Sequence, residues 1–268
     1  MEKIHKKSIP GCPLISIITV CLNDGKYLEE TIKSVINQTY SNIEYIIIDG
    51  GSTDNTIDII KKYESKIDYW LSESDKGIYD AMNKGISLAK GKWINFMNAG
   101  DTFYQADTIE KVFVKKYNEI DFIYGDCEII YNSEFSRVQK AGEIKNLWKG
   151  MVFSHQSSYI HSDYHKENKY SLNYNIAGDF EFFYNTLKKN KNFKYSNNII
   201  SIMDVNGLSD GNRFKSIRQM HQITNDNGFS LKYNVYYLYL YIDQFIRKVV
   251  KICLPESIIN LIKAKGIH

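Results

Sequence analysis

Two short stretches decide the fold: Ile15-Ser-Ile-Ile-Thr-Val-Cys21 and Glu44-Tyr-Ile-Ile-Ile-Asp49. Both are nearly continuous apolar runs rich in β-branched residues, a pattern typical of strands that are buried on both faces. The segment between them carries an apolar stripe at helical spacing, formed by Tyr27, Leu28, Ile32, Val35 and Ile36. The stretch therefore predicts two parallel strands joined by a crossover helix.

The same alternation continues to residue 101. Ser52, Thr53 and Asp54 are capping residues that predict a second helix after the second strand. A third helix is predicted before Gly91 from the stripe Tyr79, Met82, Ile86 and Ala89. A further strand is predicted from Trp93 to Met97. This order indicates an α/β fold with a mostly parallel open sheet, whose ligands bind beyond the carboxyl ends of the strands.

Composition excludes several classes of protein. The chain has 268 residues, of which 43% are hydrophobic and 24% charged, and its net charge is +3. That is enough apolar material for a sizeable core, and too little positive charge for binding nucleic acid through its phosphates. We therefore expect a folded protein that does not bind nucleic acid.

From the sequence we expect no membrane-spanning helix, no secretory signal and no disulfide. The longest run of apolar and tyrosine residues is Val235–Ile242, far below the roughly 20 residues of a membrane-spanning helix. Residues 1–7 are charged and hold no hydrophobic stretch, so we expect no secretory signal and a cytoplasmic protein. The four cysteines form no C-x-x-C pair, which predicts reduced thiols rather than disulfides or structural zinc: Cys12, Cys21, Cys127 and Cys253.

Polar side chains follow three of the predicted strands. They are Asn23 and Asp24, the run from Asp49 to Asp54, and the run from Asn98 to Asp101. Carboxylates and amides gathered at one sheet edge suit a nucleotide with a metal-bound diphosphate, although each residue alone is equally consistent with a strand end or a helix cap. No G-x-G-x-x-G follows the first strand and no P-loop is present, which disfavours NAD and P-loop chemistry.

Five segments together resemble the family 2 glycosyltransferases of the GT-A fold. They are residues 15–23, 34–40, 46–56, 75–85 and 98–101, of which the fourth reads Asp-Lys-Gly-Ile-Tyr-Asp-Ala-Met-Asn-Lys-Gly. The resemblance covers roughly residues 14–210 in the right order. It implies inverting transfer of a sugar from a nucleotide diphosphate sugar, usually with Mn²⁺ or Mg²⁺, in the synthesis of bacterial surface polysaccharides.

The resemblance also implies roles for residues of the donor half. Val20 and Leu22 would line the base pocket, and Asp49 would hydrogen-bond the base or the ribose. The segment that closes over the nucleoside would contribute Asp75, Gly77 and Asn83. Asp101 resembles the last acid of an Asp-x-Asp element and would bind the metal. Two departures stand out, because Gly50 and Asn98 occupy positions where the family often has an acid.

The acceptor half supplies the expected general base. Asp179 lies in Ile-Ala-Gly-Asp-Phe-Glu, which resembles the family motif that opens a helix, although Gly178 replaces the usual Glu. A carboxylate within hydrogen-bond reach of the acceptor hydroxyl can remove its proton. Glu181 is the second candidate for the base. The alternative for Asp179 is a helix cap.

Three further side chains have open interpretations. His155, in His-Gln-Ser-Ser, resembles a residue of the acceptor pocket and is equally consistent with a buried core histidine. Arg213 is predicted in a glycine-bearing loop, where it would contact the diphosphate or remain solvated. His161 and His165 have the spacing of a metal site on a helix, but their neighbours favour a surface loop.

The C-terminal tail has an amphipathic and basic pattern. From Leu238 to Ile252 apolar residues recur every three or four positions, and residues 231–268 hold six Lys or Arg against two acids. A second short helix is predicted from Pro255. We expect the tail to lie on an anionic membrane, with packing on the catalytic domain or on a partner subunit of a homodimer as the alternative.

The combined hypothesis is an inverting glycosyltransferase whose GT-A domain spans residues 1–230, divided at about residue 104 into donor and acceptor halves, with a helical tail at 231–268. The resemblance implies a UDP-sugar donor carrying glucose, galactose or an N-acetyl derivative. It also implies a polyprenyl-diphosphate-linked saccharide acceptor at the inner face of the cell membrane, for an O-antigen, lipopolysaccharide or capsule. A catalytically inactive binding subunit and a nucleotidyltransferase are the alternatives.

Overall fold

The computed structural model describes residues 6–115, 117, 119–204 and 212–253. The chain divides into two compact units, Met1–Gly207 and Leu208–His268.

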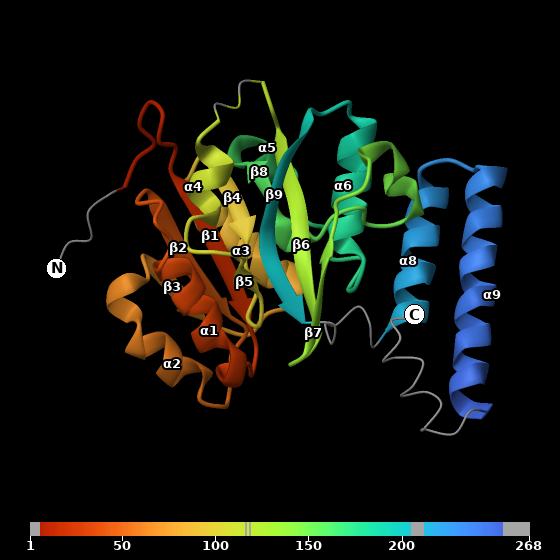
Figure 1. The fold of residues 1–268 in the computed structure, drawn as a ribbon, viewed down its shortest axis with the longest axis horizontal. Coiled ribbons are helices and arrows are strands. Elements are labelled where there is room, and N and C mark those ends of the chain that lie inside the picture. Colours follow the sequence, from red (N-terminus) through yellow and green to blue (C-terminus); the bar gives the residue numbers. More distant parts are fainter. Residues whose placement is uncertain (1–5, 116, 118, 205–211, 254–268) are drawn as a thin grey trace. The chain divides into compact units, whose positions relative to one another are not determined.

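The first unit is built on one mixed, mostly parallel sheet, as the sequence predicts (Figure 1). Its strand order is β3-β2-β1-β4-β8-β6-β9-β5, and β7 pairs with β6. The strands are β1 (Ile15–Cys21), β2 (Ile43–Asp49), β3 (Tyr69–Ser72), β4 (Trp93–Phe96), β5 (Thr102–Phe103), β6 (Phe122–Asn132), β7 (Phe135–Gln139), β8 (Ser158–His161) and β9 (Phe193–Asp204). The four strands β1 to β4 are parallel, and β8 runs antiparallel to β4.

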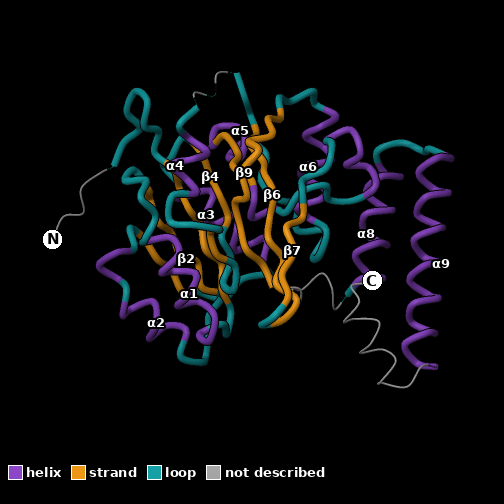
Figure 2. The backbone as a smooth tube through the Cα atoms, in the orientation of Figure 1, coloured by secondary structure: helices purple, strands orange, loops and turns teal. Residues whose placement is uncertain are grey.

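Helices cover the sheet (Figure 2). They are α1 (Gly25–Ile36), α2 (Thr56–Lys62), α3 (Ile78–Leu88), α4 (Thr108–Phe113), α5 (Ser162–Glu167) and α6 (Gly178–Lys188), with 3-10 turns η1 (Glu64–Lys66), η2 (Ile144–Lys149) and η3 (His155–Ser157). The stripe predicted for α1 is confirmed for Leu28, Ile32 and Val35, which are buried in one core cluster with strand residues, whereas Ile36 is partly buried and Tyr27 is exposed. Burial of such a stripe against a sheet is the main source of helix stability in a fold of this kind.

One expectation from the sequence is wrong. The residues after His161 form helix α5 rather than a surface loop, and His165 is fully buried. Neither ring nitrogen of His165 has a hydrogen-bond partner. The aromatic rings of Phe96, Tyr170 and Phe182 surround it, so the folded protein holds this histidine neutral, with its pKa lowered by burial.

Strand directions bring distant segments to one edge of the sheet. The carboxyl ends of β1, β2, β3 and β4 lie at the same edge because these strands are parallel. The antiparallel β8 begins at that edge, so η3 stands beside the end of β4. The edge therefore combines the donor-half and acceptor-half motifs of the sequence.

Within residues 212–253, the second unit consists of two helices that pack on each other, α8 (Arg213–Asp226) and α9 (Leu231–Cys253). Tyr237 of α9 is fully buried and stacks on His221 of α8, with ring centroids 4.8 Å apart. The amphipathic helix predicted from Leu238 thus begins earlier, at Leu231. The short helix predicted from Pro255 lies outside the described residues.

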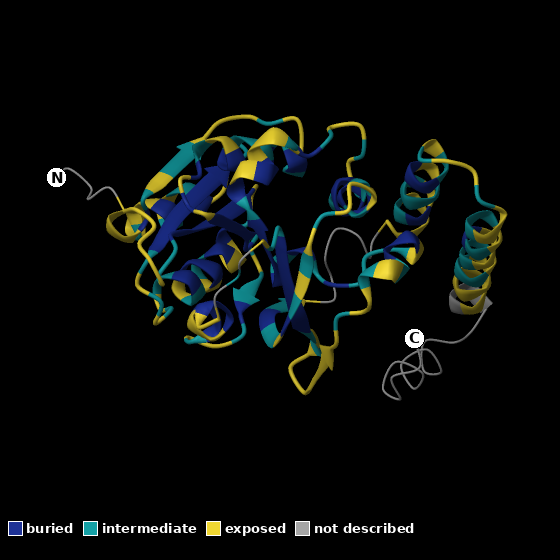
Figure 3. Ribbon diagram, turned by 90° about the horizontal axis from the view of Figure 1, so that it is seen from above, coloured by how far each residue is buried: buried dark blue, intermediate teal, exposed yellow. Residues whose placement is uncertain are grey.

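Much of α9 is exposed (Figure 3). Its exposed apolar residues recur at helical spacing and include Leu231, Val235, Leu238, Tyr239, Ile242, Phe245, Ile246, Val249 and Val250. We call this set the α9 stripe. Among the described residues, no helix is both long and apolar enough to cross a membrane.

Candidate active site

The loop after β2 is organised by Asp49. This carboxylate is fully buried and accepts hydrogen bonds from the backbone N–H of Gly51 (3.0 Å) and Ser52 (2.9 Å). The hydroxyls of Ser52 and Ser72 also donate to it, which lowers its pKa despite the opposing effect of burial. Because the chain's own donors surround Asp49, a contact to the base or ribose, as the sequence predicts, would have to replace one of them.

Beside this loop lies a small platform formed by Leu22, Gly50 and Asp75. Leu22 follows β1 and is 51% exposed. A Cβ placed on Gly50 would lie 2.5 Å from Oδ2 of Asp75 and 3.4 Å from Cδ1 of Leu22. A side chain at position 50 would therefore compete with the Asp75 carboxylate for this space. Val20, by contrast, is buried, with 5% of its surface exposed.

The segment after Asp75 is held by its own turn and by the acceptor half. Oδ1 of Asp75 accepts from the N–H of Gly77 (2.8 Å), whose φ of 115° favours glycine, and α3 begins at the next residue. Asn83, predicted to contact the nucleoside, donates to the carbonyl of Tyr170 and accepts from its N–H. Its amide thus fastens α3 to the loop before α6.

The end of β4 places Asp101 beside Gln156 of η3. The amide of Gln156 donates to Oδ2 of Asp101 at 2.7 Å. Burial raises the pKa of Asp101 to about 7, the Gln156 hydrogen bond opposes this rise, and the negative charge of Asp204 adds to it. A carboxylate with a pKa raised in this way is a candidate for a functional group.

Asp179 opens α6, as the sequence predicts. Its Oδ1 accepts from the N–H of Phe180 (2.8 Å) and lies 3.1 Å from the hydroxyl of Tyr79 in α3. Burial raises the pKa of Asp179, and these two hydrogen bonds oppose the rise. Glu181 lies on the same helix turn, half-buried, and burial raises its pKa as well.

One short segment of the chain borders both Leu22 and Asp179. Asp75 borders the platform at Leu22, and Tyr79, four residues further along in the first turn of α3, contacts Asp179. The segment 75–79 therefore connects the platform to the candidate base.

A model described as "Glycosyl transferase family 2" matches residues 16–191. The chain belongs to this family. A similar protein is "PGL/p-HBAD biosynthesis glycosyltransferase" of Mycobacterium bovis, 33% identical over 178 residues that cover 64% of this chain and 69% of that protein. An uncharacterized glycosyltransferase of Haemophilus influenzae is 30% identical over 193 residues, covering 64% and 59%.

Two solved structures share the fold. S. aureus TarS 1-349 in complex with UDP-GlcNAc has a TM-score of 0.61 and 15% identity, covering 78% of this chain and 66% of that one. The mannosyltransferase PcManGT from Pyrobaculum calidifontis, in complex with GDP-Man and Mn²⁺, has a TM-score of 0.66 and 12% identity, covering 96% and 81%. This glycosyltransferase therefore has the GT-A type of sheet and uses a nucleotide sugar.

The residues after β4 fit a divalent cation in the family 2 glycosyltransferase. Asp101 offers a carboxylate, and Oδ1 of Asn98 is buried without a hydrogen-bond partner. Mg²⁺ and Mn²⁺ prefer oxygen ligands and are commonly held by one or two protein groups together with substrate phosphates. The described residues contain no group of three or more His, Cys, Asp or Glu side chains that could hold a metal.

His155 lies within an aromatic cluster of this glycosyltransferase. It is 7% exposed, its Nε2 lies 2.7 Å from the hydroxyl of Tyr170, and its ring packs on Phe96 and Phe183. Burial lowers its pKa to about 4, so the ring is neutral at physiological pH. Of the two interpretations left open by the sequence, this packing favours the core histidine, and its neighbour Gln156 reaches the site instead.

Arg213 belongs to the second unit. It begins α8 rather than lying in a loop, which corrects the prediction from sequence. Burial raises the pKa of Tyr236 in α9, and the charge of Arg213 partly offsets that effect. Contact between Arg213 and the diphosphate stays a prediction.

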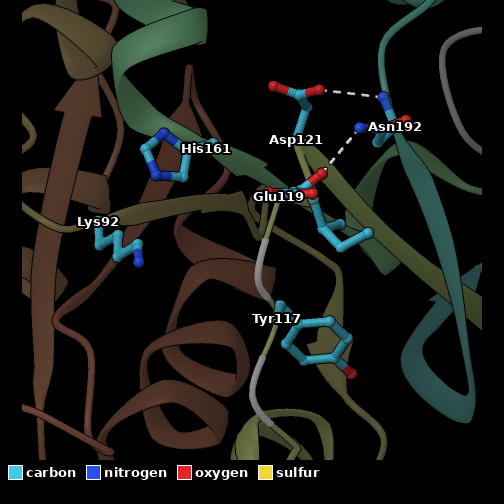
Figure 4. Close-up of a pocket in the computed structure, with 7 residues that line it drawn as sticks. Lys92, Tyr117, Glu119, Asp121, His161 and Asn192 are labelled. Carbon is cyan, nitrogen blue, oxygen red and sulfur yellow. Dashed lines mark hydrogen bonds between the residues drawn. The ribbon is translucent and has the colours of Figure 1, made fainter.

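A pocket of about 500 Å³ lies at the other edge of the sheet (Figure 4). It is lined by Lys92, Tyr117, Glu119, Ile120, Asp121, His161 and Asn192. Lys92 precedes β4, and His161 pairs with Trp93 at the start of that strand. The pocket is therefore separate from the residues that the family motifs bring together.

Sequence reasoning missed two residues of the site, Gln156 and Tyr79. Gln156 was visible only as part of the His-Gln-Ser-Ser segment, and Tyr79 only as part of the buried stripe of α3. Their hydrogen bonds to Asp101 and Asp179 join residues 55 and 100 positions apart, respectively. No local pattern carries such a signal.

Proposed function

We propose that this glycosyltransferase transfers a hexose or N-acetylhexosamine from a UDP-sugar, with inversion, to a hydroxyl of a polyprenyl-diphosphate-linked saccharide in surface polysaccharide biosynthesis. The observation that carries the proposal is the link from the platform at Leu22 and Asp75, through α3, to Asp179. TarS, which shares the fold, was solved with UDP and with UDP-GlcNAc. PcManGT was solved with GDP-Man, so a GDP-sugar is the donor class to test against UDP.

In this proposal the uracil ring lies on the exposed Leu22 side chain, and the carboxylate of Asp75 faces the nucleoside. Asp49 holds the loop between them in place through its hydrogen bonds to Gly51, Ser52 and Ser72. A side chain that already accepts several hydrogen bonds is rigid, and rigid loops bind ligands at a smaller entropic cost.

The acceptor hydroxyl would lie at Asp179. Its oxygen attacks the anomeric carbon as its proton passes to the Asp179 carboxylate, and the UDP oxygen leaves from the opposite face of the sugar. The anomeric configuration is inverted because bond formation and bond breaking occur on opposite faces. Burial raises the pKa of Asp179, which makes its ionised carboxylate a stronger base than an exposed aspartate.

Asp101 and Asn98 would hold a divalent cation, Mn²⁺ or Mg²⁺, together with the donor diphosphate. When bound, the cation neutralises negative charge on the diphosphate and so stabilises the leaving group. Gln156 keeps the carboxylate of Asp101 oriented through its 2.7 Å hydrogen bond.

The α9 stripe supports the proposal of a membrane-bound acceptor. Its exposed aliphatic and aromatic side chains lie on a helix that also carries Lys232, Arg247 and Lys248, a composition typical of helices at the membrane surface. Arg247 is paired with Asp243 at 2.7 Å, so apolar burial would contribute more than charge.

An Ile242→Asp/Phe245→Asp variant should lose binding to anionic vesicles, whereas Lys232→Gln/Lys248→Gln should weaken it only partly. If the intact protein does not bind vesicles and elutes as a dimer, the α9 stripe is instead a subunit interface.

The decisive experiment on function is calorimetric titration with UDP and with GDP, each with and without Mn²⁺, followed by nucleotide release from a panel of UDP-sugars. Tighter binding of UDP than GDP, together with release from UDP-glucose, UDP-galactose or UDP-GlcNAc, would support the proposal. Tighter binding of GDP than of UDP would instead indicate a GDP-sugar donor. Absence of both binding and release would instead favour an inactive binding subunit.

A further inference from the structure

Tyr79 is the buried side chain of α3 that reaches the candidate base. Only 7% of its surface is exposed, and its hydroxyl lies 2.9 Å from the carbonyl oxygen of Ile176 and 3.1 Å from Oδ1 of Asp179. A phenol has one proton to donate and an oxygen that accepts. The hydroxyl can therefore donate to ionised Asp179, or donate to Ile176 while accepting from protonated Asp179.

Gly178, the residue before Asp179, lies directly against the ring of Tyr79. A Cβ placed on Gly178 would lie 2.8 to 2.9 Å from three ring carbons of Tyr79, closer than real Cβ atoms approach other atoms. A side chain at position 178 would therefore overlap with the ring of Tyr79. The glycine at this position, where the family resemblance leads one to expect an acid, is the condition for the tyrosine ring to reach the start of α6.

From these contacts we infer that Tyr79 is a positioning residue for Asp179, which it holds in the orientation that accepts the acceptor proton. The inference rests on the proposed role of Asp179 as the base. Oδ1 of Asp179 is turned toward Tyr79 and the N–H of Phe180, whereas Oδ2 receives no hydrogen bond from another residue in the described part of the chain. Oδ2 is therefore the oxygen left for the acceptor.

A purely structural role for Tyr79 is the competing explanation, because its ring also packs on Tyr170 with centroids 5.5 Å apart. Tyr170 provides the matched control. It is a buried tyrosine in the same aromatic cluster, but its hydroxyl bonds His155 rather than Asp179. Burial raises the pKa of both tyrosines, and the negative charge of Asp179 adds to this rise, but of the two it is Tyr79 that hydrogen-bonds the carboxylate.

The experiment compares Tyr79→Phe and Tyr170→Phe in the full-length protein, with UDP release to water as the assay. The substrate is whichever of UDP-glucose, UDP-galactose and UDP-GlcNAc the wild type hydrolyses fastest. For Tyr79→Phe we expect kcat to fall about tenfold, with the Kd for UDP within twofold of wild type. The acidic limb of its pH profile should move to higher pH by up to about one pH unit, because a hydrogen bond to the ionised carboxylate is lost. For Tyr170→Phe the limb should not move.

A second variant, Gly178→Ala, tests the positioning role independently. In Gly178→Ala the added methyl displaces the Tyr79 ring while the hydroxyl remains, so kcat should fall again with the Kd for UDP unchanged. Wild-type kcat and pH profile in Tyr79→Phe, alongside an inactive Asp179→Asn, would overturn the positioning role and leave the proposed function intact. Normal turnover by Asp179→Asn would overturn both.

Discussion

Two carboxylates at the same edge of the sheet differ in what surrounds them. Asp49, the last residue of β2, is fully buried and accepts hydrogen bonds from two backbone N–H groups and two serine hydroxyls. Asp101, after β4, receives a side-chain hydrogen bond from Gln156 and experiences the repulsion of Asp204. The pKa of Asp49 is lowered, and that of Asp101 is raised to about 7.

This difference supports a structural role for Asp49, whereas the roles proposed for Asp101 and Asp179 are in cation binding and catalysis. The fold compensates the negative charge of Asp49 with its own donors, so ionised Asp49 stabilises the protein. Asp101 accepts a hydrogen bond from Gln156, and Asp179 accepts hydrogen bonds from Phe180 and Tyr79, but in both residues burial outweighs these bonds and raises the pKa. Carboxylates whose charge is only partly compensated are expected where a ligand, a cation or a proton completes the interaction.

The largest effect is expected at the base. Asp179→Asn should lower transfer at least about 100-fold, the usual contribution of general base catalysis, because the amide cannot take the acceptor proton. The Kd for UDP should stay near the wild-type value, since Asp179 contacts α3 and not the platform. Rates of UDP release and calorimetry on the same preparation check both statements. Glu181→Gln is the matched control on the same helix turn, and a loss in that variant instead would move the base to Glu181.

The second expected effect is on stability. Asp49→Asn should lower the free energy of unfolding by about 2 kcal/mol at neutral pH, because an amide N–H₂ then faces donors in place of an oxygen. The folded pKa of Asp49 lies below its ordinary value of 3.8, so its contribution is present above that pH and is lost as pH falls through the folded pKa. Urea unfolding at pH 7 and at pH 3 measures this. A difference that is as large at pH 3 as at pH 7 would contradict it.

The third effect concerns the cation. Asp101→Ala should weaken Mn²⁺-dependent binding of UDP about tenfold, equivalent to about 1.4 kcal/mol, because it deletes the carboxylate expected to touch the metal. Gln156→Leu keeps the carboxylate and loses only its hydrogen bond, so its effect should be smaller. Calorimetry with and without Mn²⁺ compares the two variants. Equal Mn²⁺ dependence in wild type and Asp101→Ala would place any metal elsewhere, and wild-type activity that resists EDTA would argue against a metal altogether.

The smallest expected effect concerns Asp101, whose contribution to stability depends on pH in the opposite direction to that of Asp49. The folded pKa of Asp101 is about 7, so between pH 4 and pH 7 the folded protein holds a proton that the unfolded chain releases. Its stability contribution is therefore present at low pH and is lost as pH rises through that window. In metal-free buffer at pH 7.5, Asp101→Asn should unfold with a free energy about 1 kcal/mol higher than wild type. Stabilisation that is equally large at pH 4 would contradict this reasoning.

The sequence predicts the architecture well because the responsible signals are local. The strands β1 and β2 are long apolar runs, and the stripe of α1 follows from helical spacing, so the mostly parallel sheet and its polar edge can be read without the structure. The same holds for Asp179 at the start of α6. Residues such as His165 were misplaced because a short helix in a polar segment has little periodicity of its own, and burial by distant aromatic rings decided its environment.

By itself, the sequence determined the family, the order of the elements and the carboxylates at the sheet edge, since each depends on residues close together in the chain. Tertiary structure alone decided how each carboxylate is used. The donors that hold Asp49, the amide of Gln156 at Asp101 and the hydroxyl of Tyr79 at Asp179 come mostly from other elements. The same holds for the glycines, because Gly50 and Gly178 lie where side chains of segment 75–79 fill the space. Hydrogen bonding and steric exclusion act over a few ångströms in space, and only the folded chain brings these residues within that distance.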